Sequence, residues 1–187
     1  MKKFIIIVLC IALLFVGVDA AYYRLGAYID LNPSKEVKTF VKTKENKILL
    51  NSGKGYNEFE IKGVNLGSGE PGEWSTDFSI DKETYKRWFK YIKEMNANVI
   101  RVYTALSPDF YRALYDYNID NDDPLYLIQG VWMDEEDIET YGDVYAENEK
   151  IKTEFTKDAL NMVDIIHGNI TLPERSGYAA GTYTADV

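Results

Sequence analysis

The chain has 187 residues, of which 46% are apolar, and its 30 Asp and Glu against 21 Lys and Arg give a net charge of −9. This apolar content excludes a disordered chain, and the acidic balance argues against nucleic acid as a partner, because phosphate binding needs a basic face. The single cysteine, Cys10, excludes a disulfide framework. The single histidine, His167, excludes a histidine-rich metal site and argues against a Ser-His-Asp triad. We therefore expect neither a metal nor a cofactor.

The N-terminus carries the pattern of an export signal. Lys2-Lys3 precedes an uncharged apolar run of fifteen residues, 4–18, which ends at the small-residue sequence Val18-Asp19-Ala20. A basic start, a short apolar run and small residues at its end are typical of a secretory signal peptide. The alternative is an uncleaved signal-anchor, a transmembrane helix that holds the chain in the membrane. Residues 1–21 are thus predicted to be one or the other, and the protein to be extracellular or anchored at the cell surface.

The next segments are expected to lead into a folded domain that begins at residue 47. Residues 22–46 have mixed polarity and are predicted to form a stalk. Strands are predicted at 48–50 and 59–64, on either side of a turn-rich stretch. The glycine-rich loop 67–72 lacks the Lys-Ser/Thr ending of a phosphate-binding loop, so nucleotide binding is rejected.

Strands and helices then alternate along the chain. Asp81 is a plausible N-cap for a helix with an apolar face, and Ser107-Pro108 starts a second helix. Further strands are predicted at 99–104 and 124–132, and a long helix at 146–167. This order predicts a parallel sheet with right-handed crossovers.

Three phrases of the sequence resemble clan A glycoside hydrolases. Residues 59–67 (Phe-Glu-Ile-Lys-Gly-Val-Asn-Leu-Gly) resemble the first barrel strand of that clan, and residues 95–103 are similar to its second strand, with Asn96 in place of a glycine. The stretch Gln129-Gly130-Val131-Trp132 resembles the third strand of the family 2 and family 5 barrels. The resemblance implies an α/β fold with part of a (β/α)8 TIM barrel, about three β/α units plus an N-terminal β-hairpin, preceded by an apolar helix. It also implies a poly- or oligosaccharide as the partner.

The catalytic carboxylates of the resembled family have no match here. Such a barrel needs about 250 residues, whereas residues 47–187 supply 141, so we expect the N-terminal portion of a longer, truncated enzyme. The family places its two glutamates after strands four and seven, the first commonly preceded by Asn. Asn57-Glu58 and Asn148-Glu149 fall in the predicted hairpin and at a helix start, so no acid/base or nucleophile is assigned and the chain alone is expected to be inactive. The alternative is a non-catalytic, membrane-tethered carbohydrate-binding or interaction domain.

Five residues are candidates for substrate binding. The resemblance places Arg101 beside the nucleophile, which it would orient; an ordinary salt bridge is the alternative. Asn65, Tyr103 and Trp132 fall at the C-terminal ends of predicted strands, the face that carries the site in these barrels. Trp132, and Trp74 in the loop after the first strand, are candidates for stacking on a sugar ring, with simple packing as the alternative.

Two further features are read as structural. The acidic run from Asp134 to Glu139 lacks the alternating spacing of a calcium loop, so a solvated loop is expected. His167 lies near the end of the last predicted helix and is expected to cap its dipole.

Overall fold

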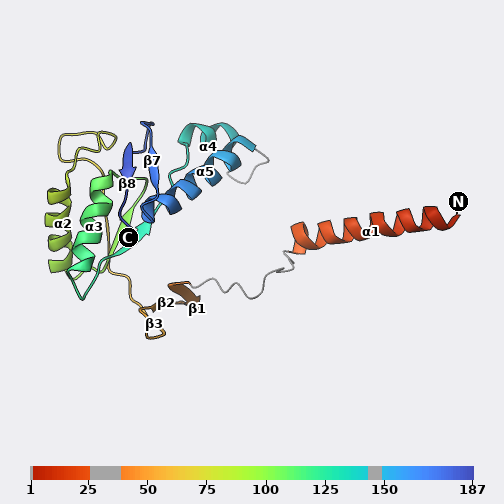
Figure 1. The fold of residues 1–187 in the computed structure, drawn as a ribbon, viewed down its shortest axis with the longest axis horizontal. Coiled ribbons are helices and arrows are strands. Elements are labelled where there is room, and N and C mark those ends of the chain that lie inside the picture. Colours follow the sequence, from red (N-terminus) through yellow and green to blue (C-terminus); the bar gives the residue numbers. More distant parts are fainter. Residues whose placement is uncertain (1, 26–38, 143–148) are drawn as a thin grey trace. The chain divides into compact units, whose positions relative to one another are not determined.

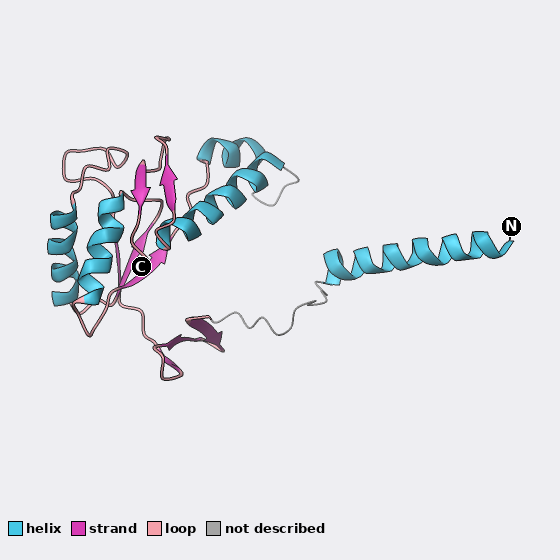
Figure 2. Ribbon diagram, viewed as in Figure 1, coloured by secondary structure: helices cyan, strands magenta, loops and turns pink. Residues whose placement is uncertain are grey.

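The computed structural model describes residues 2–25, 39–142 and 149–187. The chain divides into two compact units, Met1–Phe59 and Glu60–Val187. Figures 1 and 2 show their helices and strands. Each unit contains both helix and small β-sheet, so the chain is of mixed α/β type.

The first unit consists of one helix and one antiparallel sheet. The helix is α1 (Lys2–Leu25), and the sheet has the order β1-β2-β3, with the bounds β1 (Val41–Lys44), β2 (Lys47–Asn51) and β3 (Tyr56–Glu58). An ion pair of 2.6 Å between Lys47 Nζ and Glu58 Oε2 joins β2 to β3. The expected hairpin is thus a three-stranded meander, and β1 lies inside the range predicted as a stalk. Residues 26–38 of that stalk lie outside the described residues.

The prediction of a transmembrane helix is wrong. Within the described residues, no helix has both the length and the apolar character needed to cross a bilayer. The reason lies in the charges of α1, because Lys3 and Asp19 confine its uncharged run to residues 4–18. As a helix, that run is about 22 Å long, whereas the hydrocarbon core of a membrane is about 30 Å thick. Export of the chain stays a prediction.

The second unit is built on a three-stranded parallel sheet of order β4-β5-β6. Two helices connect its strands, which gives two consecutive β–α–β units with the bounds β4 (Gly63–Asn65), α2 (Lys82–Glu94), β5 (Val99–Val102), α3 (Pro108–Ile119) and β6 (Tyr126–Gln129). The strand predicted at 59–64 is mostly wrong. Residues 60–62 are held instead by the side chain of Asn98, which accepts from Lys62 N and donates to Glu60 O, each at 2.8 Å.

Helices α2 and α3 begin where the sequence predicts and pack side by side (Figure 1). Asp81 Oδ1 accepts a hydrogen bond of 2.7 Å from Thr84 N, which satisfies one free donor at the start of α2. Pro108 occupies the first turn of α3. The two helices meet through buried aromatic rings, with Phe110 edge-on to Tyr85 and to Phe89 at centroid distances of 5.3 and 5.7 Å.

The two faces of the parallel sheet have different surroundings. Val64, Ile100 and Leu127 lie in register and belong to the core under α2 and α3. The neighbouring row of Asn65, Arg101 and Ile128 is exposed. Because side chains alternate between the faces of a strand, this second row lies on the opposite face. The helices therefore cover one face of the sheet, and the other face is open at this row.

The acidic segment after β6 is a helix and not the predicted loop. α4 (Glu135–Tyr141) begins after Asp134, whose carboxylate accepts from Asp137 N at 3.1 Å, and it ends at Gly142 with a φ of 67°. An N-cap followed by acidic residues in the first turn suits the positive end of a helix dipole. The consecutive acidic residues therefore form the N-terminal turn of α4.

The rest of the unit consists of α5 (Glu149–Ile166) and an antiparallel pair, β7 (Ile170–Leu172) and β8 (Gly181–Tyr183). Met162 and Ile165 of α5 join the core, and Tyr183 of β8 stacks edge-on against Tyr111 of α3. His167 follows α5 directly, and its Nδ1 lies 3.0 Å from Asp186 Oδ1. The described residues form no fourth parallel strand and no closed barrel.

Candidate functional site

An open cleft of about 850 Å³ lies where β5 and β6 end. Tyr103 and Thr104 follow β5 in its wall, and Trp132 follows β6. The start of α4 and the segment 175–178, which precedes β8, supply the remaining charged walls. The C-terminal ends of two parallel strands thus present aromatic and charged side chains to one cavity, which is where ligands bind in parallel α/β sheets.

Two aromatic side chains in the cleft are partly accessible. Tyr103 is 36% exposed and Trp132 is 44% exposed. Gly130 brings the strand ends that carry them close together, because a β-carbon at this position would lie 2.7 Å from Val102 O and 2.9 Å from Tyr103 O. Rings that are half-accessible in a cavity can bury the apolar face of a flat ligand at little entropic cost.

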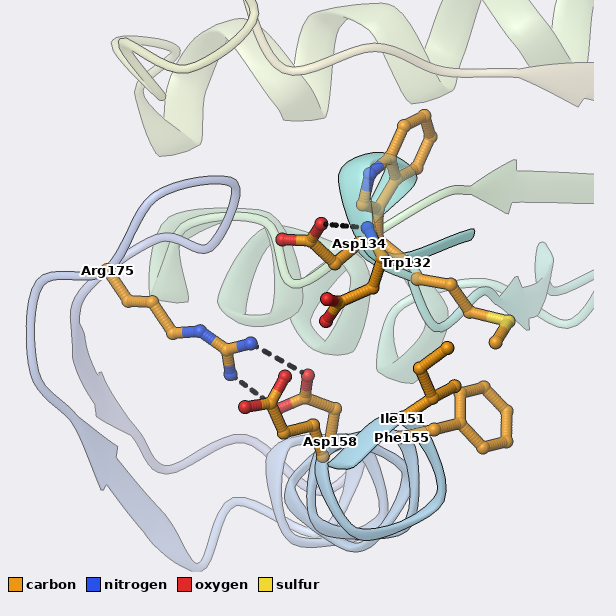
Figure 3. Close-up of a pocket in the computed structure, with 9 residues that line it drawn as sticks. Trp132, Asp134, Ile151, Phe155, Asp158 and Arg175 are labelled. Carbon is orange, nitrogen blue, oxygen red and sulfur yellow. Dashed lines mark hydrogen bonds and ion pairs between the residues drawn. The ribbon is translucent and has the colours of Figure 1, made fainter. Parts of the chain in front are cut away.

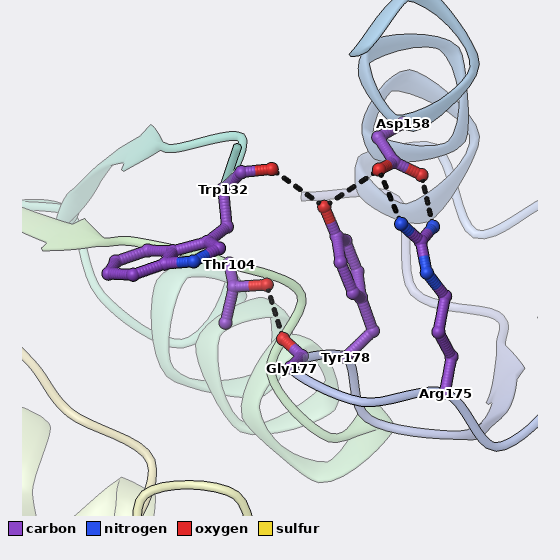
Figure 4. A network of polar contacts seen from close by, with 6 residues as sticks. All are labelled: Thr104, Trp132, Asp158, Arg175, Gly177 and Tyr178. Carbon is purple, nitrogen blue, oxygen red and sulfur yellow. Dashed lines mark hydrogen bonds and ion pairs between the residues drawn. The ribbon is translucent and has the colours of Figure 1, made fainter. Parts of the chain in front are cut away.

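A buried carboxylate anchors the wall formed by residues 175–178 (Figure 4). Asp158 of α5 is 3% exposed and accepts two hydrogen bonds from Arg175, at 2.6 Å from Nη1 and 3.0 Å from Nη2. The Tyr178 hydroxyl lies 3.0 Å from Asp158 Oδ2 and 3.0 Å from the carbonyl oxygen of Trp132. Thr104 Oγ1 donates to Gly177 O at 2.7 Å. The network ties this segment to α5 and to the ends of β5 and β6.

The pKa values of Arg175 and Tyr178 are both raised in this network. The hydrogen bonds to Asp158 raise the pKa of Arg175 above its ordinary value. Burial, followed by the hydrogen bond to Asp158, raises the pKa of Tyr178 well above that of a free tyrosine. Tyr178 is therefore a hydrogen-bond donor, and its one proton is shared between two acceptors.

A second, much smaller cavity of about 20 Å³ is lined in part by the Arg175–Asp158 pair of this network (Figure 3). Its lining includes Asp134, Asp158 and Arg175, together with Ile151 and Phe155 of α5. This volume holds about one water molecule, so the cavity is too small for a substrate. The described part of the chain contains no group of three or more His, Cys, Asp or Glu side chains arranged to hold a metal ion.

The structure brings two of the five predicted binding residues into the cleft. Tyr103 and Trp132 line it. Arg101 and Asn65 pair in register on the open face of the sheet, and the Arg101 guanidinium lies 4.6 Å from the centre of the Tyr103 ring. Trp74 is 79% exposed and does not line the cleft. The predicted cluster is therefore split between the cleft and the sheet face.

Sequence reasoning missed Asp158, Arg175 and Tyr178. One signal was present, because Asp158 occupies the inward face of α5 at helical spacing from Ile151 and Met162. A lone carboxylate among buried apolar positions requires a partner. The position of Arg175 and Tyr178, in an irregular segment, carries no comparable signal.

Comparisons with protein-family models, with curated proteins and with solved structures found no match to this chain. The function therefore has to be inferred from the cleft itself.

Proposed function

We propose that this chain belongs to a glycoside hydrolase-like protein and binds a poly- or oligosaccharide in the cleft at the ends of β5 and β6. The observation that carries the proposal is the pair of partly exposed rings, Tyr103 and Trp132, in one open cavity. Sugar rings have an apolar face and a polar rim, so an aromatic platform surrounded by hydrogen-bonding groups matches them.

The arrangement of the sheet supports the same proposal. Helices α2 and α3 cover one face of three sequential parallel strands. Arg101, which the resemblance to clan A enzymes would place beside the nucleophile, lies on the other face. Parallel barrels have helices outside and carry their sites at the C-terminal strand ends.

The proposal is for binding without hydrolysis by this chain. Glycoside hydrolysis needs two carboxylates on opposite sides of the scissile bond. The carboxylates that line the cleft are Asp134, Glu135 and Glu136. They are consecutive at the start of one helix, so they approach a ligand from one side. Glu58 and Glu149, the glutamates that follow Asn, lie in β3 and at the start of α5.

The test is a comparison of two tryptophan variants. We expect soluble β-linked oligosaccharides to bind the chain in calorimetry, and Trp132→Ala to weaken binding by up to about ten-fold, because an aromatic contact contributes about 0.5–1.5 kcal/mol beyond the area it buries. Trp74→Ala is the matched control, since it removes an exposed indole that does not line the cleft. An equal loss of oligosaccharide affinity in both variants, or no binding by the unmodified chain, would refute the proposal.

A further inference from the structure

The ion pair in the cleft wall bears on which sugars the cleft accepts. Of the described residues that line the cleft, Arg175 alone is basic. Its side chain is 46% exposed, while the side chain of its partner Asp158 is 5% exposed. The positive charge therefore reaches the cleft, and the negative charge that balances it lies behind.

The guanidinium is held rigidly but keeps donors for a ligand. It carries five N–H groups, and Asp158 accepts from two nitrogens in a bidentate arrangement. The planar group also lies over the Tyr178 ring, 4.5 Å from its centre. Its remaining N–H groups are fixed in direction and suit the adjacent hydroxyl groups of a sugar ring.

The other charged side chains that line the cleft are acidic. Asp134, Glu135 and Glu136 line it, and Glu135 and Glu136 form no ion pair with any residue that the structure describes. A carboxylate ligand would meet these charges and a guanidinium that Asp158 has already neutralised. A neutral sugar meets neither obstacle.

We propose that Asp158 is a specificity-determining residue: by neutralising Arg175 from behind, it makes the cleft accept neutral sugars and reject uronic acids. This rests on the proposed function of the cleft in carbohydrate binding. Asp158 acts through Arg175 and does not touch the ligand. Without its charge, this part of the cleft wall gains one net positive charge at Arg175, which favours a ligand carboxylate over a neutral sugar.

The test compares cellotetraose with tetragalacturonic acid, a neutral and an anionic tetramer, by calorimetry at low salt. The unmodified chain is expected to bind cellotetraose and to bind tetragalacturonic acid at least about ten-fold more weakly. In Asp158→Asn the ratio of the two dissociation constants is expected to shift toward the anionic sugar by about ten-fold, and the shift is expected to shrink in high salt. If the role of Asp158 were purely structural, Asp158→Asn would weaken the binding of both tetramers by the same factor.

The control is Asp123→Asn, which removes an aspartate paired with Lys93 on the surface outside the cleft lining and is expected to leave the ratio unchanged. The inference is overturned if the unmodified chain binds the anionic tetramer as tightly as the neutral one, a result that does not depend on the folding of any variant. It is also overturned if folded Asp158→Asn keeps the original ratio; in both cases the proposed function survives. Binding of neither tetramer, nor of any other oligosaccharide, overturns the proposed function and this inference together.

Discussion

At the scale of single residues, we expect replacement of Asp158 by the isosteric asparagine to lower the stability of the folded chain. Asp158→Asn keeps the side-chain volume but removes the charge that holds two guanidinium nitrogens. We expect the free energy of unfolding to fall by about 1–3 kcal/mol, less than for a fully buried pair, because the Arg175 side chain is 46% exposed and is solvated in the variant. Urea denaturation should show a lower midpoint with an unchanged slope.

The control for this prediction is a short ion pair at the surface. Lys93 Nζ lies 2.7 Å from Asp123 Oδ2, but the side chain of Asp123 is 81% exposed. Asp123→Asn should therefore leave the urea midpoint nearly unchanged. Equal shifts in the two variants would show that burial of Asp158 adds nothing to its ion pair.

At the scale of the element, the start of α2 should make stability sensitive to acid. The backbone N–H of Thr84 holds the pKa of Asp81 below its ordinary value, because it donates to the ionised carboxylate. A lowered pKa in the folded state means that the stabilisation is present above the pKa of the unfolded chain, about 3.9. It is lost as the pH falls further, through the folded value.

Two substitutions separate the cap from its charge. Asp81→Ala should lower the urea midpoint at pH 7, because it removes the acceptor for Thr84 N. Asp81→Ser keeps an acceptor that does not ionise, so it should retain most of the stability at pH 7 and lose the contribution that Asp81 makes to acid sensitivity. If Asp81→Ser and the unmodified chain lose stability in parallel below pH 4, the carboxylate does not act as described.

Element by element, the sequence predicts what depends on local chemistry. Asp81 and Pro108 mark the starts of α2 and α3, because capping and the fixed φ of proline act within one turn. The start of α4 carries the same signal at Asp134, but without an apolar stripe it reads as a solvated loop. Residues 60–62 read as a strand because their alternation is local, whereas their hydrogen bonds come from Asn98, far along the chain.

At the scale of the whole molecule, four buried tyrosines should couple global stability to alkaline pH. Burial raises the pKa of each above that of a free tyrosine: Tyr85, Tyr111, Tyr178 and Tyr183. Their stabilising contribution is complete below the unfolded pKa, about 10. Above that pH the unfolded chain ionises first, so stability falls by up to about 1.4 kcal/mol per pH unit for each tyrosine.

One substitution tests the origin of this alkaline sensitivity. Tyr111 is 1% exposed, and its hydroxyl donates to Gln129 Oε1 at 2.8 Å. Tyr111→Phe should flatten the fall in stability between pH 10 and 11, measured by urea denaturation at each pH. Tyr115→Phe changes a tyrosine on the same helix that is 41% exposed, and it should leave the slope unchanged. Identical slopes in all three proteins would contradict the prediction.

The sequence predicts the residues of the candidate site that follow strands of the parallel sheet, but not those that come from elsewhere in the chain. Tyr103 and Trp132 follow two buried strands, so parallel pairing alone brings them to one edge. Arg175 and Tyr178 reach the same cavity from an irregular segment before β8, and their position depends on Asp158 in α5. Long-range polar contacts of this kind leave no periodic trace in a sequence.

Gly130 has a consequence for how this cleft can vary. The backbone of β5 fills the space in which a side chain at position 130 would begin. Any other residue has to push the ends of β5 and β6 apart, and with them Tyr103 and Trp132. In a library with every amino acid at this position, retention of ligand binding should select glycine, while Ile128, two residues earlier and 41% exposed, should vary freely. The spacing of the two rings thus depends on the absence of a β-carbon at position 130. A single substitution of Gly130 is enough to change it.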